Sequence, residues 1–167
     1  MTLIPLIHKL IDIPLIAAGG IATGKQMLAA MALGADGVQT GSRFVTAEES
    51  SAHPAFKQKV VEAGDGTTRL MMKNLVPVRL LKNPFQEQVQ EAEMHGASAE
   101  ELKTLLGRGR AKKGMFEGDL TEGELEIGQV AALISDIKPA ETIVNEIISD
   151  FEKQLSMLFN VFTLKSS

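Results

Sequence analysis

Two short apolar runs, each ending in glycine, constrain the fold of this chain more than any other feature. Residues 13–18 end at the pair Gly19-Gly20, and residues 37–40 end at the pair Gly41-Ser42. The first run is apolar up to its glycines, which predicts a strand buried on both faces of a parallel sheet. Residues 23–33, between the runs, have apolar positions at the three- and four-residue spacing of an amphipathic helix. Together these segments predict a parallel βαβ unit with a right-handed crossover.

The residues that end both runs suit a phosphate site. Glycine lets the backbone approach an anion closely, and the helix that follows directs unpaired amide groups and its positive dipole end toward that anion. In the second unit, Ser42 adds a hydroxyl donor to the backbone amides. Gly-Gly after a strand is also frequent as a simple turn, so it is the pair of units that favours a ligand. Neither unit has the spacing of a Walker loop or of the G-x-G-x-x-G fingerprint.

The rest of the chain is predicted to be mainly helical. Helices are expected at residues 3–11, 86–94, 98–106 and 128–135, and from residue 140 onward. Ser98 and Glu101 predict a capping box for the third of these. Two short helical pieces, separated at His53-Pro54, are expected between residues 46 and 66, followed by a proline-interrupted connection. Since the periodicity is lost near the carboxyl terminus, we expect one domain over residues 1–155 and a tail of uncertain structure over residues 156–167.

Composition excludes several kinds of partner and site. A formal net charge of -4 over 167 residues gives no electrostatic reason to expect a nucleic acid or an anionic membrane as partner. The chain has no cysteine, which excludes disulfides and thiolate ligands. The histidines lack metal-ligand spacing, so no metal site is expected. No apolar run approaches the length that crosses a bilayer, and no signal peptide is recognisable, so the expected location is cytoplasmic.

Residues 13–44, "IPLIAAGGIATGKQMLAAMALGADGVQTGSRF", resemble the FMN-phosphate segment of the nitronate monooxygenases, a family formerly called 2-nitropropane dioxygenases. The resemblance continues through "PVRLLKN" and "GRGRAKKGMFEGDLTEGELEIGQVAALISDIKPAETIV" to about Glu152. The glycine units alone would also fit other FMN-binding or phosphate-binding barrels. The stretch "EGD…GE…GQ" is more selective, because it is shared mainly by nitronate monooxygenases and the related FMN-dependent enoyl-ACP reductases.

The resemblance implies an α/β fold, namely the carboxyl-terminal portion of a (β/α)8 TIM barrel. The two strands would be equivalent to the seventh and eighth of the barrel, and a helical region would follow them. It further implies that FMN is lined by Gly19, Gly20, Gln39, Thr40, Gly41 and Ser42. In that picture the amides of Gly20, Gly41 and Ser42 hold the phosphate, and Gln39 lies nearer the ribityl chain or the ring.

Other polar residues have a structural interpretation at least as good as a functional one. Gly128-Gln129 could return to the barrel mouth or simply begin a helix. His53 is matched in the family and could be mistaken for a base, but a histidine before a proline at a turn favours a local hydrogen bond. The basic cluster is more consistent with a solvated loop than with a site that steers an acidic carrier protein; it comprises Arg108, Arg110, Lys112 and Lys113. Met71, Met72 and Met115 are expected to be apolar fillers.

The resemblance implies an FMN-dependent oxidoreductase that oxidises alkyl nitronates with oxygen. In the family, a Gly-Gly-His segment upstream of the first strand seen here carries the catalytic base, and no residue of this chain matches it. The chain is therefore expected to be a truncated part without a catalytic residue of its own, to be completed by self-association or by a separate amino-terminal half. The alternatives are an FMN-dependent enoyl-ACP reductase and a non-catalytic remnant that binds flavin phosphate weakly or not at all.

Overall fold

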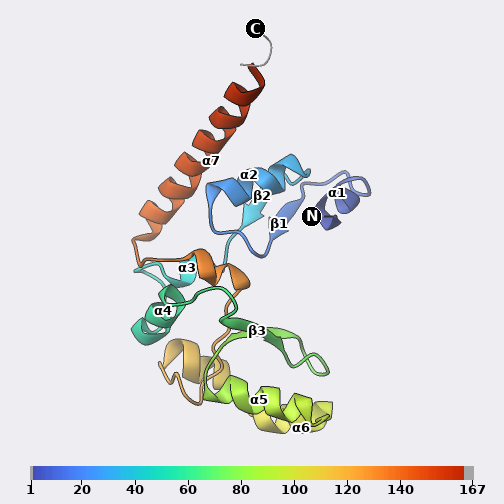
Figure 1. Ribbon diagram of the computed structural model, residues 1–167, viewed down its shortest axis with the longest axis vertical. Coiled ribbons are helices and arrows are strands. Elements are labelled where there is room, and N and C mark those ends of the chain that lie inside the picture. Colours follow the sequence, from blue (N-terminus) through green and yellow to red (C-terminus); the bar gives the residue numbers. More distant parts are fainter. Residues whose placement is uncertain (1, 164–167) are drawn as a thin grey trace.

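The computed structural model describes residues 2–163, with side chains described up to residue 160. In chain order the elements are α1 (Leu3–His8), β1 (Ile16–Ala18), α2 (Gly24–Ala32), β2 (Gly37–Gln39), α3 (Ser42–Val45), α4 (Pro54–Val61), β3 (Thr68–Met71), β4 (Val78–Leu81), α5 (Pro84–Met94), α6 (Ala99–Leu106), η1 (Lys112–Phe116), η2 (Gln129–Leu133) and α7 (Ala140–Thr163). In Figure 1 the unit β1–α2–β2 lies between α1 and α7, and the hairpin that begins with β3 lies at the opposite end with α5 and α6. The fold is of the α/β type and rich in helix.

The predicted strand–helix–strand unit is confirmed. β1 and β2 pair in parallel, with Ala17 opposite Val38, and α2 connects them. The Thr23 side chain accepts a hydrogen bond from the Gln26 amide and so caps α2 at its start. Just beyond the end of α2, Gly34 has φ +106°, the left-handed conformation that glycine adopts without strain.

The prediction that the first strand is buried on both faces is wrong. Ala17 is 7% exposed, whereas Ile16 is 54% and Ile13 is 70% exposed. The strand is also shorter than expected, beginning at Ile16. In the part of the chain that is described, β2 is the one strand that pairs with β1, so the other edge of β1 has no strand beside it.

Residues 67–85, expected to be an irregular connection, form an antiparallel hairpin. β3 and β4 pair with Thr68 opposite Leu81 and Met71 opposite Val78. The hairpin packs against α5 and α6 in a buried apolar cluster made of Met71, Met72, Leu80, Phe85, Val89 and Leu102. Met71 and Met72 are thus apolar fillers, as predicted, and Met115 packs in part against a second cluster around Phe56.

The helix predictions are largely confirmed, although the helix expected at residues 128–135 is a short 3-10 helix, η2, and one further segment is not helical. α5 and α6 form where expected, and Ser98 and Glu101 make the reciprocal bonds of a capping box. Residues 46–53, by contrast, contain no helix. The short helix there begins earlier, at Ser42, and ends at Val45, while α4 starts at Pro54 with His53 as its cap.

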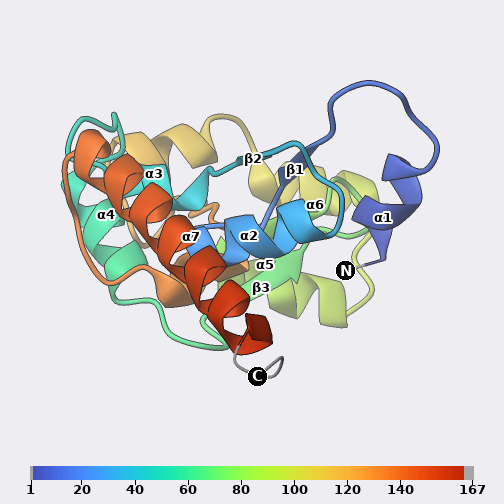
Figure 2. The same cartoon turned by 90° about the horizontal axis from the view of Figure 1, so that it is seen from above.

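The longest helix, α7, packs across α2 (Figure 2). The two backbones approach so closely that a Cβ added to Gly24 would collide with the Ile147 carbonyl oxygen and the Phe151 amide nitrogen. α7 continues to Thr163, past residue 155, where the tail was expected to begin. Residues 164–167 lie outside the described part of the chain, and the division into a domain and a tail stays a prediction.

Candidate functional site

The six residues predicted to line the cofactor gather at one edge of the parallel sheet. Since β1 and β2 run in the same direction and Ala18 lies opposite Gln39, the residues that follow each strand emerge side by side. Gly19 and Gly20 therefore lie next to the segment 40–42. Gln39 and Gly41 are exposed, and the edge is open to a ligand.

The backbone at this edge is shaped for close approach. Gly19 and Gly20 have φ values of +96° and +71°, a conformation that strains residues with a side chain. A Cβ added at Gly19, Gly20 or Gly41 would have no atom within 4 Å. Backbone conformation thus requires glycine at positions 19 and 20, whereas Gly41 has φ -101°, and all three leave open space above the loops. This combination fits a cofactor phosphate held by main-chain amides.

Gly128 returns to this site from the far end of the sequence. Its N–H donates to the Ser42 Oγ over 3.0 Å. A Cβ added at Gly128 would lie 2.7 Å from that Oγ, so only glycine permits the contact. Gly128 directly precedes η2, so the interpretation as a helix start is confirmed, and the same residue also contacts Ser42. Gln129 is exposed on the first turn of η2.

Arg79 is a neighbour of this site that the sequence did not single out. It lies on β4 and lines a shallow pocket together with Ser42, Glu126 and Gly128. Its Nη1 donates to the Thr68 backbone oxygen over 3.2 Å and to the Thr68 Oγ1 over 3.1 Å. The hairpin that carries Arg79 was not expected, so no pattern in the sequence brought it near Ser42.

The amino terminus of α2 does not present free amides, contrary to the expectation for the first glycine unit. The Lys25 N–H donates to Asp150 Oδ2 over 2.8 Å, and the Ala22 N–H donates to Gln26 Oε1 over 2.9 Å. Hydrogen bonds from the Gln154 side chain and from the Lys25 amide lower the pKa of Asp150. A carboxylate from α7 thus occupies the positive end of α2, and the amides of the glycine loops remain as the candidates for holding an anion.

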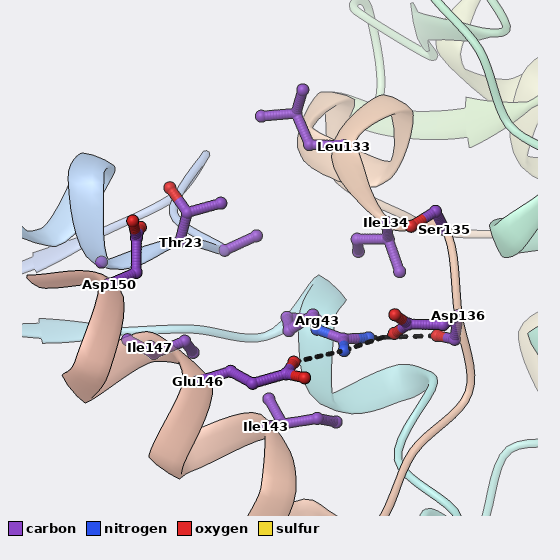
Figure 3. A pocket seen from close by; sticks show the side chains of 12 residues that line it. Thr23, Arg43, Leu133, Ile134, Ser135, Asp136, Ile143, Glu146, Ile147 and Asp150 are labelled. Atoms are coloured by element: carbon purple, nitrogen blue, oxygen red, sulfur yellow. Dashed lines mark hydrogen bonds and ion pairs between the residues drawn. The ribbon is translucent and has the colours of Figure 1, made fainter. Parts of the chain in front are cut away.

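The start of α3 is held by a buried arginine. Arg43 is 7% exposed, and its Nη2 lies 2.6 Å from Asp136 Oδ1. Figure 3 shows the guanidinium between α3, the segment around Asp136 and Glu146 of α7, in a pocket that Thr23 and Asp150 also line. The Ser42 and Arg43 amides belong to the first helical turn and have no partner within α3.

The remaining candidates are engaged in local contacts. The His53 Nδ1 accepts a hydrogen bond from the Ala55 N–H over 3.2 Å, so His53 is the local hydrogen-bonder that was predicted. Three members of the basic cluster pair with nearby acidic residues at 3.0–3.3 Å, namely Arg110, Lys112 and Lys113. Within residues 2–163, no group of three or more potential ligands could hold a metal ion, and no helix is long and apolar enough to cross a membrane.

The family model described as nitronate monooxygenase matches residues 1–150. The chain belongs to the nitronate monooxygenase family. A relative in this family, a probable nitronate monooxygenase of Bacillus subtilis, is 47% identical over 70 residues, which are 42% of this chain and 20% of the relative. The resemblance inferred from the glycine units and from the carboxyl-terminal segments is thereby confirmed.

Two solved structures share the fold of this nitronate monooxygenase family member. FabK from Thermotoga maritima superposes with a TM-score of 0.89 and 38% identity over 96% of this chain and 51% of that chain. The nitroalkane oxidase of Streptomyces ansochromogenes superposes with a TM-score of 0.72 and 28% identity over 94% of this chain and 44% of that chain. The chain therefore spans about half the length of its structural neighbours.

Proposed function

We propose that this chain is the flavin-phosphate-binding, carboxyl-terminal part of an FMN-dependent nitronate monooxygenase, an enzyme that oxidises alkyl nitronates with oxygen. The observation that carries the proposal is the convergence of both glycine loops at one sheet edge, within a chain of this family. In this proposal β1 and β2 are the seventh and eighth strands of a TIM barrel, whose ligand site lies at the carboxyl ends of the strands. A cytoplasmic location remains a prediction from the sequence.

Each part of the site has a separate task in this proposal. The loops of Gly19-Gly20 and Gly41-Ser42 bind the phosphate through their amides, and Thr40 and Gln39 line the cofactor farther along. The Ser42 Oγ already accepts a hydrogen bond from Gly128, so its own proton is free to be donated to a phosphate oxygen. When bound, the flavin supplies the transfer of electrons from the substrate to oxygen.

In this proposal, none of the 167 residues is the base that abstracts the proton from the substrate. His53 is committed to the cap of α4 and lies against Gly118, where an added Cβ would collide with its ring. The resemblance locates the base in a segment upstream of β1. The whole reaction then requires a segment that the 167 residues described by this sequence do not include.

A second candidate reaction is that of an FMN-dependent enoyl-ACP reductase. It is favoured by the superposition on FabK, and it is compatible with the stretch from Glu117 to Gln129, which these reductases share with nitronate monooxygenases. Both candidates use the same phosphate site, so the loops described here do not discriminate between them. Nitrite release from propionate 3-nitronate, compared with reduction of an enoyl thioester by a nicotinamide cofactor, separates them once the base-bearing half is supplied.

The phosphate site itself can be tested on the chain as it stands. We expect the purified protein to bind FMN at least about tenfold more tightly than riboflavin, because the two flavins differ only in the phosphate that the loops contact. Flavin fluorescence during titration measures both affinities. Equal affinity for FMN and riboflavin would contradict the proposal and favour the non-catalytic remnant.

A further inference from the structure

Arg43 follows Ser42 directly, yet its side chain makes all of its contacts away from the glycine loops. Nη1 donates to Thr46 Oγ1 over 2.8 Å and to the Asp136 carbonyl oxygen over 3.1 Å. Nη2 lies 2.6 Å from Asp136 Oδ1 and 3.9 Å from Glu146 Oε2. The guanidinium is therefore committed to the protein and does not reach the ligand edge of the sheet (Figure 3).

The two carboxylates that hold Arg43 are themselves held by Lys138. Its Nζ lies 2.9 Å from Asp136 Oδ2 and 2.5 Å from Glu146 Oε1. Burial alone would raise the pKa of Asp136, but hydrogen bonds from Lys138 and Arg43 outweigh it and lower the pKa. Two cations and two anions thus balance, and the buried guanidinium keeps one fixed position.

α3 needs such support, because a helix of four residues cannot hold its own orientation. Its first two residues are anchored on the two flanks of η2. Ser42 is bonded to Gly128, which precedes η2, and Arg43 is bonded to Asp136, which follows η2. Removing either anchor frees α3 to turn relative to the sheet edge.

We propose that Arg43 is a positioning residue that fixes the amides and hydroxyl of the Gly41-Ser42 loop toward the cofactor phosphate. The proposal rests on the proposed function, since it assigns Arg43 a task in the same site. Arg43 acts through α3 and not by touching the phosphate. Its effect is therefore confined to the part of the flavin that this loop binds.

The test compares FMN and riboflavin binding to the wild-type chain, to Arg43→Met and to a matched control, Arg110→Met. Arg110 donates comparable hydrogen bonds to Leu106 and Glu122 in another part of the molecule. We expect Arg43→Met to lose about tenfold of the preference for FMN, because displaced amides no longer meet the phosphate oxygens, with riboflavin affinity unchanged. Arg110→Met should keep the preference. An unchanged preference in Arg43→Met would overturn the proposal.

A second readout does not depend on flavin. The amides of Phe44 and Val45 donate to the Gly41 carbonyl oxygen, so their exchange reports on the order of α3. Exchange at these two amides should accelerate in Arg43→Met relative to Arg110→Met and the wild type. If the wild type shows no preference for FMN, the proposed function fails, and hydrogen exchange then decides whether Arg43 positions the loop. Should Arg43→Met not fold, Arg43→Lys takes its place, because it keeps the charge but cannot make the forked contact with Asp136. Exchange unchanged at Phe44 and Val45 would refute the positioning role.

Discussion

Gly128 illustrates how a single missing side chain permits a contact between distant parts of the chain. An added Cβ would lie 2.7 Å from Ser42 Oγ, at the point where the Gly128 N–H donates to that oxygen. We expect Gly128→Ala to lower the free energy of unfolding by about 1 kcal/mol, the worth of one hydrogen bond. A fall in melting temperature of about 2–4 °C in thermal unfolding would register this loss.

The matched control for this substitution is Gly64→Ala. An alanine Cβ at residue 64 would meet no atom within 4 Å, and the backbone there is not left-handed. Replacing such a glycine leaves stability unchanged or raises it slightly, because the unfolded chain loses freedom. Equal destabilisation by both substitutions would show that the contact with Ser42 contributes nothing.

The burial of Glu124 should make the stability of the fold depend on pH. It is buried, and burial, with repulsion from Glu126, raises its pKa from 4.5 to about 7. A carboxyl group whose pKa is higher in the folded state stabilises the fold below pH 4.5 and loses this contribution as the pH rises toward 7. Glu124→Gln should therefore melt higher than the wild type at pH 8 and close to it at pH 4. The same difference in melting temperature between Glu124→Gln and the wild type at pH 4 and at pH 8 would refute the raised pKa of Glu124.

At the scale of elements, the crossing of α2 and α7 depends on Gly24. A Cβ at this position would collide with the backbone of α7, which cannot yield as a flexible side chain would. We expect Gly24→Ala to cost at least about 1–3 kcal/mol of unfolding free energy and to expose α7 to limited proteolysis. Lys25→Ala is the control, since it keeps the amide that binds Asp150. If α7 resists limited proteolysis equally well in both variants, Gly24 does not have this role.

The elements that the sequence predicted correctly are those whose signals are local. The apolar spacing of α2, its closing glycine and the Ser98–Glu101 capping box each lie within a few neighbouring residues. The hairpin of β3 and β4 was missed because its pairing brings together residues separated by Pro77 and a loop. The Asp150 contact with α2 was missed for the same reason, since it spans 125 positions and no pattern near either residue marks it.

The residues of the candidate site likewise fall into those that local sequence signals predict and those that only tertiary packing brings together. The six residues predicted to line the cofactor could be named from the strand–glycine pattern and the family resemblance, and the structure brings them to one edge. The contact of Gly128 with Ser42, the place of Arg79 near Ser42 and the ion pair of Arg43 with Asp136 all depend on tertiary packing. Sequence spacing carries no information about such contacts.

For the whole molecule, the exposed apolar side chains predict self-association of the chain when it is alone. Ile16 is 54% exposed on a strand with an unpaired edge, and Leu3 and Leu6 of the adjacent helix α1 are 67% and 57% exposed. In Figure 1 this flank lies on the side of the parallel sheet away from α7. Such a flank favours association with another copy or with the part of the relatives' fold that these residues do not cover.

We expect gel filtration and sedimentation to show concentration-dependent oligomers, which Ile16→Thr should shift toward monomer. Val76→Thr is the control, because Val76 is 69% exposed in the connection between β3 and β4, far from this flank. A monomer at every concentration for the wild type would refute the expectation. Supplying the amino-terminal half of a relative should suppress the oligomers if this flank is the surface it covers.

The attachment of α2 and α3 to α7 has a consequence for synthesis. Asp150 and Glu146 contact residues that leave the ribosome more than a hundred positions earlier, at Lys25 and Arg43. A chain that ends before residue 140 already contains Gly128 and Asp136, which hold α3, but it lacks the contacts that α7 makes with α2 and with Arg43. A nascent chain halted before residue 140 should therefore bind flavin more weakly than the complete chain, and the full affinity should arise only at the end of translation.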